Sequence, residues 1–192
     1  MLKELKEYVV DDIVHKDTKV IFVLESPHTQ EVKHGYPVAG KSGVDMSLVL
    51  LDKNEPLGKL IYEKKLSYLG LLNISNIPLQ KSAYNNPDAK VLEFFETIRQ
   101  NPKPRKNPKN GINLVIEKML NSFKTRLEKH KDKKLVLCGN FAQSAFDVVF
   151  SEDDFKEVLR VPHPSFNNWR KMRYKSKIEQ LKEFIFTAHN IS

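Results

Sequence analysis

The sequence has little of what several classes of protein require. Among its 192 residues there is a single cysteine, Cys138, which excludes a disulfide framework and a metal or iron–sulfur site with cysteine ligands. No run approaches the roughly 20 apolar residues that cross a bilayer, and the first residues lack the apolar core of a signal peptide. We therefore expect a cytoplasmic protein that binds no metal or cofactor and contacts no membrane.

An excess of positive charge is the main feature of the composition. Lys and Arg total 32 and Asp and Glu total 24, which gives a net charge of +8 and an isoelectric point near 9.4. This charge favours a polyanionic partner such as nucleic acid, although the same excess can serve solubility alone. Hydrophobic residues at 40% and charged residues at 29% are typical of a globular chain. We expect a single monomeric domain over residues 1–192.

The chain alternates between short apolar runs and amphipathic segments. The runs have the composition of strands buried on both faces, and they cover residues 18–24, 69–75, 134–138 and 156–161. Helical spacing of apolar residues predicts helices over residues 1–14, 44–51, 57–66, 88–100, 112–130, 140–150 and 169–188. Polar loops are expected over residues 25–43 and over the proline-rich residues 101–110. This order predicts a three-layer α/β/α sandwich with a mainly parallel four-stranded sheet.

One segment matches a phosphate-binding pattern letter for letter. Residues 35–42 (GYPVAGKS) fit G-x-x-x-x-G-K-[ST], in which Lys41 would reach a terminal phosphate. That loop must leave a strand directly, whereas the nearest predicted strand ends at Leu24. We therefore keep a P-loop NTPase as a remote alternative only. The simpler interpretation of Lys41 is an exposed basic residue in a glycine-rich turn.

Four motifs lie at the predicted strands and the loops that follow them. They are VLESPHTQEVKHGYPVAGKSG (residues 23–43), NISNIPLQ (73–80), LVLCGNFAQSAF (135–146) and VPHPSF (161–166). In this order they resemble the motifs of the uracil-DNA glycosylase superfamily. The resemblance implies an α/β/α fold and an enzyme that flips a damaged or deaminated base out of DNA and hydrolyses its bond to the sugar.

The resemblance also implies roles for single residues. Glu25 matches a carboxylate that positions the attacking water and stabilises the sugar cation, and His163 matches a histidine that donates a hydrogen bond to the departing base anion. Asn76 matches an asparagine that reads the base edge, with Asn73 as a weaker candidate for that role. Ser165 would contact a backbone phosphate or cap a turn.

The first motif supplies further candidates for substrate binding, namely Ser26, Pro27, His28, Tyr36, Val38 and Gly40. Two of them depart from the family pattern, since Val38 stands where an aromatic residue usually stacks on the base, and Ser26 stands where one branch has an aspartate before the proline. Tyr36 and His28 are nearby rings that could take the stacking role. The departures keep open an alternative: an inactive nucleic-acid or nucleotide binding module with the same fold.

Aromatic and basic residues after the last motif suggest a DNA surface. Phe166 or Trp169 could enter the gap that a flipped base leaves in the stack. Arg170, Lys171 and Arg173 could hold the neighbouring phosphates, because they adjoin the loop that carries His163. For Trp169, a buried position at the start of the last helix is the competing interpretation.

Overall fold

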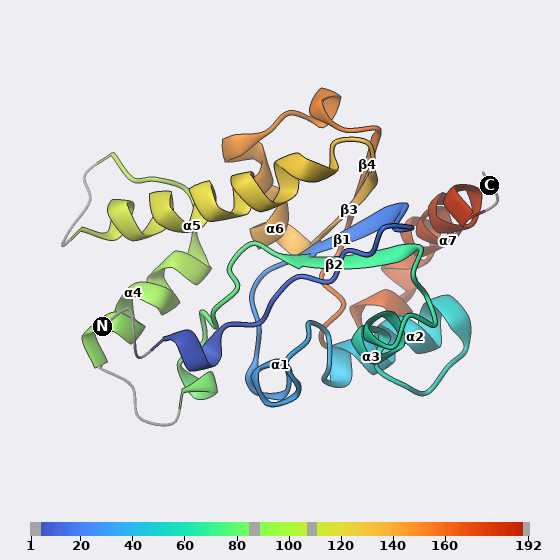
Figure 1. Cartoon of the computed structure of the whole chain (residues 1–192), viewed down its shortest axis with the longest axis horizontal. Helices are drawn as coiled ribbons and strands as arrows, with labels where there is room; N and C mark the ends of the chain where they lie inside the picture. Colours follow the sequence, from blue (N-terminus) through green and yellow to red (C-terminus); the bar gives the residue numbers. More distant parts are fainter. Residues whose placement is uncertain (1–4, 85–88, 107–110, 190–192) are drawn as a thin grey trace.

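The four strands form one parallel sheet, in a computed structural model that describes residues 5–84, 89–106 and 111–189 (Figure 1). They are β1 (Val20–Leu24), β2 (Leu69–Asn73), β3 (Lys134–Cys138) and β4 (Glu157–Val161). Their order is β2-β1-β3-β4, with every neighbouring pair parallel. The carboxyl ends of all four strands therefore lie at the same edge of the sheet, where ligands bind in open α/β folds.

Helices cover both faces of this sheet. They are α1 (Thr29–His34), α2 (Lys41–Leu51), α3 (Leu57–Tyr62), α4 (Ala89–Gln100), α5 (Ile112–Leu127), α6 (Gly139–Val149) and α7 (Lys175–His189). Side chains alternate along each strand, so Phe22 belongs to the apolar cluster that includes residues of α2, α3 and α7, whereas Val23 belongs to the cluster that includes residues of α4, α5 and α6. Figure 1 shows these two helical layers on opposite sides of the strands. The predicted three-layer sandwich is confirmed.

The prediction of a helix over residues 1–14 is wrong for the part of it that the structure describes. Only Lys6–Tyr8 form a short 3-10 turn, and the chain then runs extended, with Ile13 bridging Leu71 in antiparallel fashion. β2 is an edge strand, and its outer backbone groups need partners that a helix could not supply. This requirement outweighs the helical spacing of the apolar residues. Leu2 lies outside the described residues.

Two other predictions need correction. Residues 25–43 are not all loop, because α1 lies within them and α2 begins at Lys41 rather than at residue 44. The last helix does not start at Trp169: two 3-10 turns, Asn168–Arg170 and Met172–Tyr174, come before α7. In these turns the indole of Trp169 is buried, whereas Arg170 and Lys171 face solvent.

The remaining predicted elements match the structure to within a few residues, although the predicted helix over residues 57–66 ends at Tyr62. Asp88 and residues 107–110 of the proline-rich segment lie outside the described part of the chain. None of the helices that the structure describes combines the length and the hydropathy needed to cross a membrane.

Candidate active site

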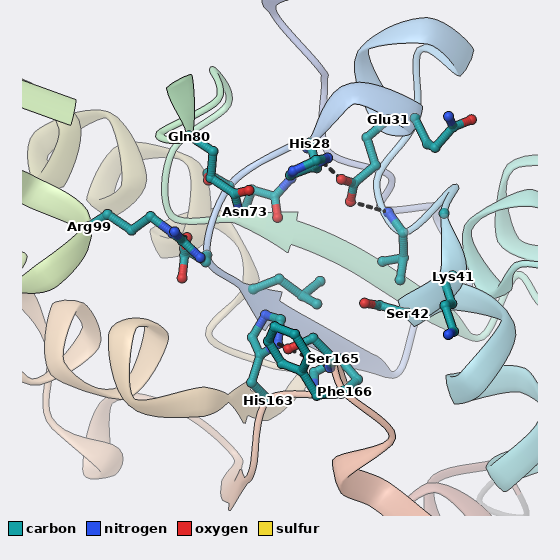
Figure 2. Close-up of a pocket in the computed structure, with 17 residues that line it drawn as sticks. His28, Glu31, Lys41, Ser42, Asn73, Gln80, Arg99, His163, Ser165 and Phe166 are labelled. Atoms are coloured by element: carbon teal, nitrogen blue, oxygen red, sulfur yellow. Dashed lines mark hydrogen bonds and ion pairs between the residues drawn. The ribbon is translucent and has the colours of Figure 1, made fainter. Parts of the chain in front are cut away.

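A pocket of about 490 Å³ opens at the carboxyl edge of the sheet (Figure 2). The loop after β1 contributes Glu25 and His28, and the last residue of β2 contributes Asn73. The loop after β4 contributes His163 and Phe166. The parallel sheet thus brings together side chains that are far apart in the sequence, and Glu25 and His163 share one pocket.

Backbone and side-chain bonds fix the loop that carries His163. The indole N–H of Trp169 donates to the carbonyl of Pro162 at 2.7 Å, and the Asn168 amide donates to the carbonyl of His163 at 3.1 Å. The backbone N–H of Ser165 donates to Nδ1 of His163 at 3.2 Å. Because a backbone N–H can only donate, Nδ1 is the acceptor in this bond and carries no proton. In the neutral ring the proton therefore lies on Nε2.

Burial lowers the pKa of His163, with the positive charge of Arg99 acting in the same direction and the carboxylate of Glu25 opposing them. The imidazole is therefore neutral near pH 7 and offers one N–H donor, at Nε2. A neutral donor is suited to stabilising an anion that forms during a reaction, since it does not attract negative charge before that point.

Gly139, the first residue of α6, lies directly beneath His163. Its φ of +84° is in the left-handed region, and a Cβ added there would lie 2.7 Å from the Cβ of His163. Only glycine allows this conformation and this close approach together. The third motif of the sequence, residues 135–146, therefore supports the histidine, and none of its residues lines the pocket.

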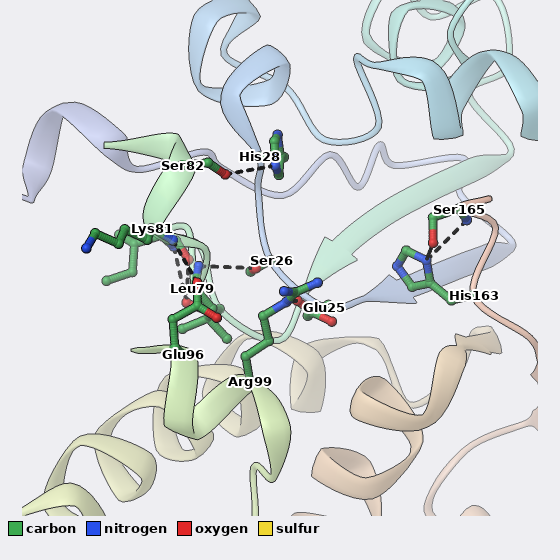
Figure 3. A network of polar contacts seen from close by, with 12 residues as sticks. Glu25, Ser26, His28, Leu79, Lys81, Ser82, Glu96, Arg99, His163 and Ser165 are labelled. Atoms are coloured by element: carbon green, nitrogen blue, oxygen red, sulfur yellow. Dashed lines mark hydrogen bonds and ion pairs between the residues drawn. The ribbon is translucent and has the colours of Figure 1, made fainter. Parts of the chain in front are cut away.

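Glu25 forms an ion pair with Arg99 across one side of the pocket (Figure 3). Nε of Arg99 donates to Oε1 of Glu25 at 2.7 Å, and the Glu25 side chain is only 16% exposed. The guanidinium holds the carboxylate in place. Nothing in the sequence pattern pointed to Arg99, because it comes from α4, 74 residues further along the chain.

Glu31 of α1 connects two parts of the first-motif loop. Its carboxylate accepts the backbone N–H of His28 at 2.5 Å and that of Val38 at 2.8 Å. Val38 has a φ of +56°, a strained value for a β-branched residue, and the bond from Glu31 helps to hold it there. Burial raises the pKa of Glu31 to about 6, against these two hydrogen bonds. Sequence reasoning missed Glu31, although its place three residues after His28 fits a capping box.

Asn73 occupies the pocket position that was expected for Asn76. Asn73 is 1% exposed and lines the pocket, and its Nδ2 has no hydrogen-bond partner within the described part of the chain. Asn76 lies outside the pocket, where its carbonyl accepts the N–H of Val10. The reason is that β2 ends at Asn73, so Asn76 is already in the turn that leaves the sheet edge.

The other residues of the first motif divide between the pocket and its surroundings. Ser26, His28, Val38 and Gly40 line the pocket, whereas Pro27 and Tyr36 do not. Tyr36 stacks on Tyr62 with ring centroids 5.1 Å apart, so it is not available to a base in the pocket. His28 is the ring from this loop that lines the cavity, with its Nε2 3.4 Å from the hydroxyl of Ser82.

The residues after His163 also separate by exposure. Phe166 is 86% exposed at the pocket rim, whereas Trp169 is 3% exposed and packed against Phe22, so Trp169 cannot enter a base stack. Lys171 and Arg173 face solvent. Arg170 is exposed as well, but its guanidinium lies 3.7 Å from the carboxylate of buried Asp45, which gives it a structural partner.

The phosphate-binding pattern does not form its characteristic structure. β1 ends at Leu24, and helix α1 intervenes before residues 35–42. Lys41 is the first residue of α2, but β1 does not lead directly into the glycine-rich turn before it. This arrangement removes the support for a P-loop NTPase, although Lys41 and Ser42 line the same pocket as His163.

A comparison with protein-family models identifies the chain. The model of the uracil DNA glycosylase superfamily matches residues 12–185, which is most of the chain. The chain belongs to the uracil-DNA glycosylase superfamily. No curated protein matches it as a relative. Membership supports a glycosylase-like function, and it agrees with the parallel sheet and with the position of the pocket.

Replacing Gly139 with Ala should displace His163. The left-handed backbone alone should lower the free energy of unfolding by about 1–2 kcal/mol, and the new methyl group must also push His163 away. Gly111→Ala is the matched control, because Gly111 has a φ of +72° but none of the described residues places an atom within 4 Å of an added Cβ. Denaturant unfolding should show a loss in both variants. Only Gly139→Ala should shift the imidazole NMR signals of His163; equal shifts would contradict this support role.

Replacing Glu31 with Gln should change how stability depends on pH. Because the pKa of Glu31 is raised to about 6 on folding, its contribution to the free energy of unfolding is present at low pH and is lost as the pH rises through 6. Between about pH 5 and about pH 7 this contribution should fall by about 1 kcal/mol. Unfolding measured at both pH values should show that difference between wild type and Glu31→Gln. Glu117→Gln, a change at an exposed position, should leave the pH dependence of unfolding as in wild type. If Glu31→Gln also kept the pH dependence of wild type, the raised pKa assigned to Glu31 would be refuted.

Proposed function

We propose that this protein hydrolyses the N-glycosidic bond of a base flipped out of DNA. The observation that carries the proposal is that one pocket holds the neutral donor of His163 together with the Arg99-paired carboxylate of Glu25. A damaged or single-stranded DNA would be the substrate, in base excision repair, with the chain acting as a single-domain monomer in the cytoplasm. The family match supports the general class of this activity.

The pocket has a group for each charge that this reaction develops. As the bond between the base nitrogen and C1′ of the sugar breaks, its electron pair leaves with the base, and the sugar becomes an oxocarbenium-like cation. Nε2–H of His163 would stabilise the base anion, and the carboxylate of Glu25 would stabilise the cation and orient a water. Oxygen of that water then bonds to C1′, and its proton is released, balancing the base's negative charge.

Asn73 would recognise the base. A carboxamide offers a donor and an acceptor side by side, which is the pattern needed to distinguish the edge of uracil from that of cytosine. Its Nδ2 has no hydrogen-bond partner among the residues that the structure describes, and a buried donor in that state gains most from a ligand acceptor. His28 lies on the Asn73 side of the pocket, opposite His163 and Phe166, and would contact the ring of the base (Figure 2).

DNA would bind across the rim of the pocket. Phe166 would fill the gap left in the base stack, and Lys171 and Arg173 would contact the backbone phosphates. Ser165, whose hydroxyl lies 2.8 Å from Nδ1 of His163, would link the phosphate position to the histidine.

A second candidate is a module that binds nucleic acid or nucleotides without cleaving them. One observation favours it: Val38, which lines the pocket, cannot stack on a base as an aromatic ring does. Both candidates predict binding, so measurements of cleavage are what separate them.

The test is a panel of labelled oligonucleotides that contain uracil, hypoxanthine or oxidised bases. We expect cleavage of at least one of them by the wild type. His163→Ala should reduce the rate about 10²–10³-fold while leaving the affinity for DNA nearly unchanged, because its hydrogen bond strengthens only as the base becomes an anion. His130→Ala, which alters a histidine outside the pocket, is the matched control. Binding without cleavage of any substrate would favour the inactive module.

Binding to DNA should also depend on salt through the surface beside His163. Replacing both Lys171 and Arg173 with Ala should flatten the log–log slope of affinity against salt by about 1–2 units, whatever the DNA sequence. Arg170 is left unchanged because it pairs with buried Asp45. The control replaces Lys118 and Lys124 of α5, which lie on exposed positions of the other helical layer. Equal slopes for the two double variants would remove this surface from the proposal.

A further inference from the structure

The outer side of β2 is covered in an unusual way at its carboxyl end. As an edge strand, β2 has backbone groups that β1 cannot pair. The bridge between Ile13 and Leu71 satisfies the middle of the strand. Beyond it, at Asn73, the partners are not another strand but two charged side chains, Asp12 and Arg126.

These two side chains form a clamp on the peptide groups around Asn73. Arg126 of α5 donates to both carboxylate oxygens of Asp12, at 2.8 and 2.6 Å. Its other terminal nitrogen donates to the carbonyls of Asn73 and Ile74, at 2.8 and 2.9 Å. Asp12 in turn accepts the backbone N–H of Asn73 at 3.2 Å. The clamp therefore reaches both polar groups of the Asn73 backbone.

β1 fixes the same segment from the opposite side. The N–H of Ile74 donates to the carbonyl of Leu24 at 2.9 Å, and the N–H of Ser75 donates to the carbonyl of Glu25 at 3.1 Å. The backbone at Asn73 is thus held from both sides, whereas Nδ2 of its carboxamide has no partner within the described residues. A fixed backbone beneath an unpartnered polar group is the arrangement expected of a group reserved for a ligand.

Stability alone is a weak explanation for the clamp. The side chains of Arg126 and Asp12 are only 18% and 15% exposed, and a largely buried ion pair is often no more stabilising than apolar residues of similar volume. Apolar residues could not, however, satisfy one N–H and two carbonyls at the end of an edge strand. What the charged pair adds is a defined geometry for the backbone of Asn73.

We propose that Asp12 and Arg126 are positioning residues that orient the carboxamide of Asn73 toward the base and so determine which base is accepted. This inference rests on the proposed function for its substrate. It adds that selectivity depends on two residues that do not line the pocket. A displacement of about 1 Å at a reacting or recognising group can cost about 10²-fold in rate, so a small movement of β2 should be measurable.

The central variant is Arg126→Lys, which keeps a positive charge but cannot contact Asp12 and two carbonyls in the same fork-like geometry. Arg160→Lys is the matched control, because Arg160 also pairs with two carboxylates, Asp147 and Glu152, without lining the pocket. Asp12→Asn is the conservative variant, since its remaining oxygen can still accept the N–H of Asn73. Thermal unfolding of each variant measures the purely structural effect.

The readouts are the ratio of kcat/KM between the best base and the next, and the side-chain amide NMR signals of Asn73, assigned by their loss in Asn73→Asp. Arg126→Lys should reduce the ratio about 10-fold or more and shift these signals. Asp12→Asn should have a smaller effect, and Arg160→Lys should change neither readout. A loss of stability in Arg126→Lys with an unchanged ratio and unchanged signals would overturn the proposal.

Failure of the proposed function would be recognised separately. If the wild type cleaves no base in the panel, the glycosylase assignment fails, and the Asn73 signals alone decide whether the clamp positions this side chain. Shifted signals in Arg126→Lys, with Arg160→Lys unchanged, would then still support the positioning role. Identical signals in wild type and Arg126→Lys would overturn it.

Discussion

The parallel pairing of β1 with β2 and β3 is the constraint on which the site depends. Glu25, Asn73 and His163 each end a strand or follow one, so the register of the sheet sets where they lie. Leu24 pairs with Asn73, which places the first-motif loop beside the base-reading position proposed for Asn73. A slip of one residue would turn Asn73 to the opposite face. The apolar faces that pack against two helical layers prevent that slip.

Around this sheet, polar contacts take over where the strands end. Arg99, Glu31 and Arg126 come from three different helices, and each makes a hydrogen bond or ion pair to a strand end or to the loop after it. Each of these contacts involves a charged side chain that is partly buried. In such surroundings hydrogen bonds are stronger than in water, and unpaired polar groups are costly. The strands thus set where the pocket residues lie, and side chains from the helices set how those residues are oriented.

The sequence predicted the sheet and the placement of Glu25 and His163 because those features follow from local patterns. Runs such as TKVIFVL identify a buried strand without any tertiary information, and a parallel sheet gathers the loops that follow its strands. It could not predict Arg99 or Arg126, because their partners lie 74 and 114 residues away. It also favoured Asn76 over Asn73, since a motif match does not reveal at which residue a strand ends.

Phe166 and the residue after it both have positive φ, at 57° and 53°, and the ring is left almost fully in water. The left-handed backbone at these two positions places an apolar side chain outside the fold, with the bonds of Trp169 and Asn168 holding the loop behind it. The backbone of such a loop is preorganised, because the conformational entropy of ordering it is lost during folding rather than at encounter. A partner that contacts this ring would therefore meet a loop whose backbone is already in place, and the gain would be seen in how fast the complex forms as well as in how long it lasts.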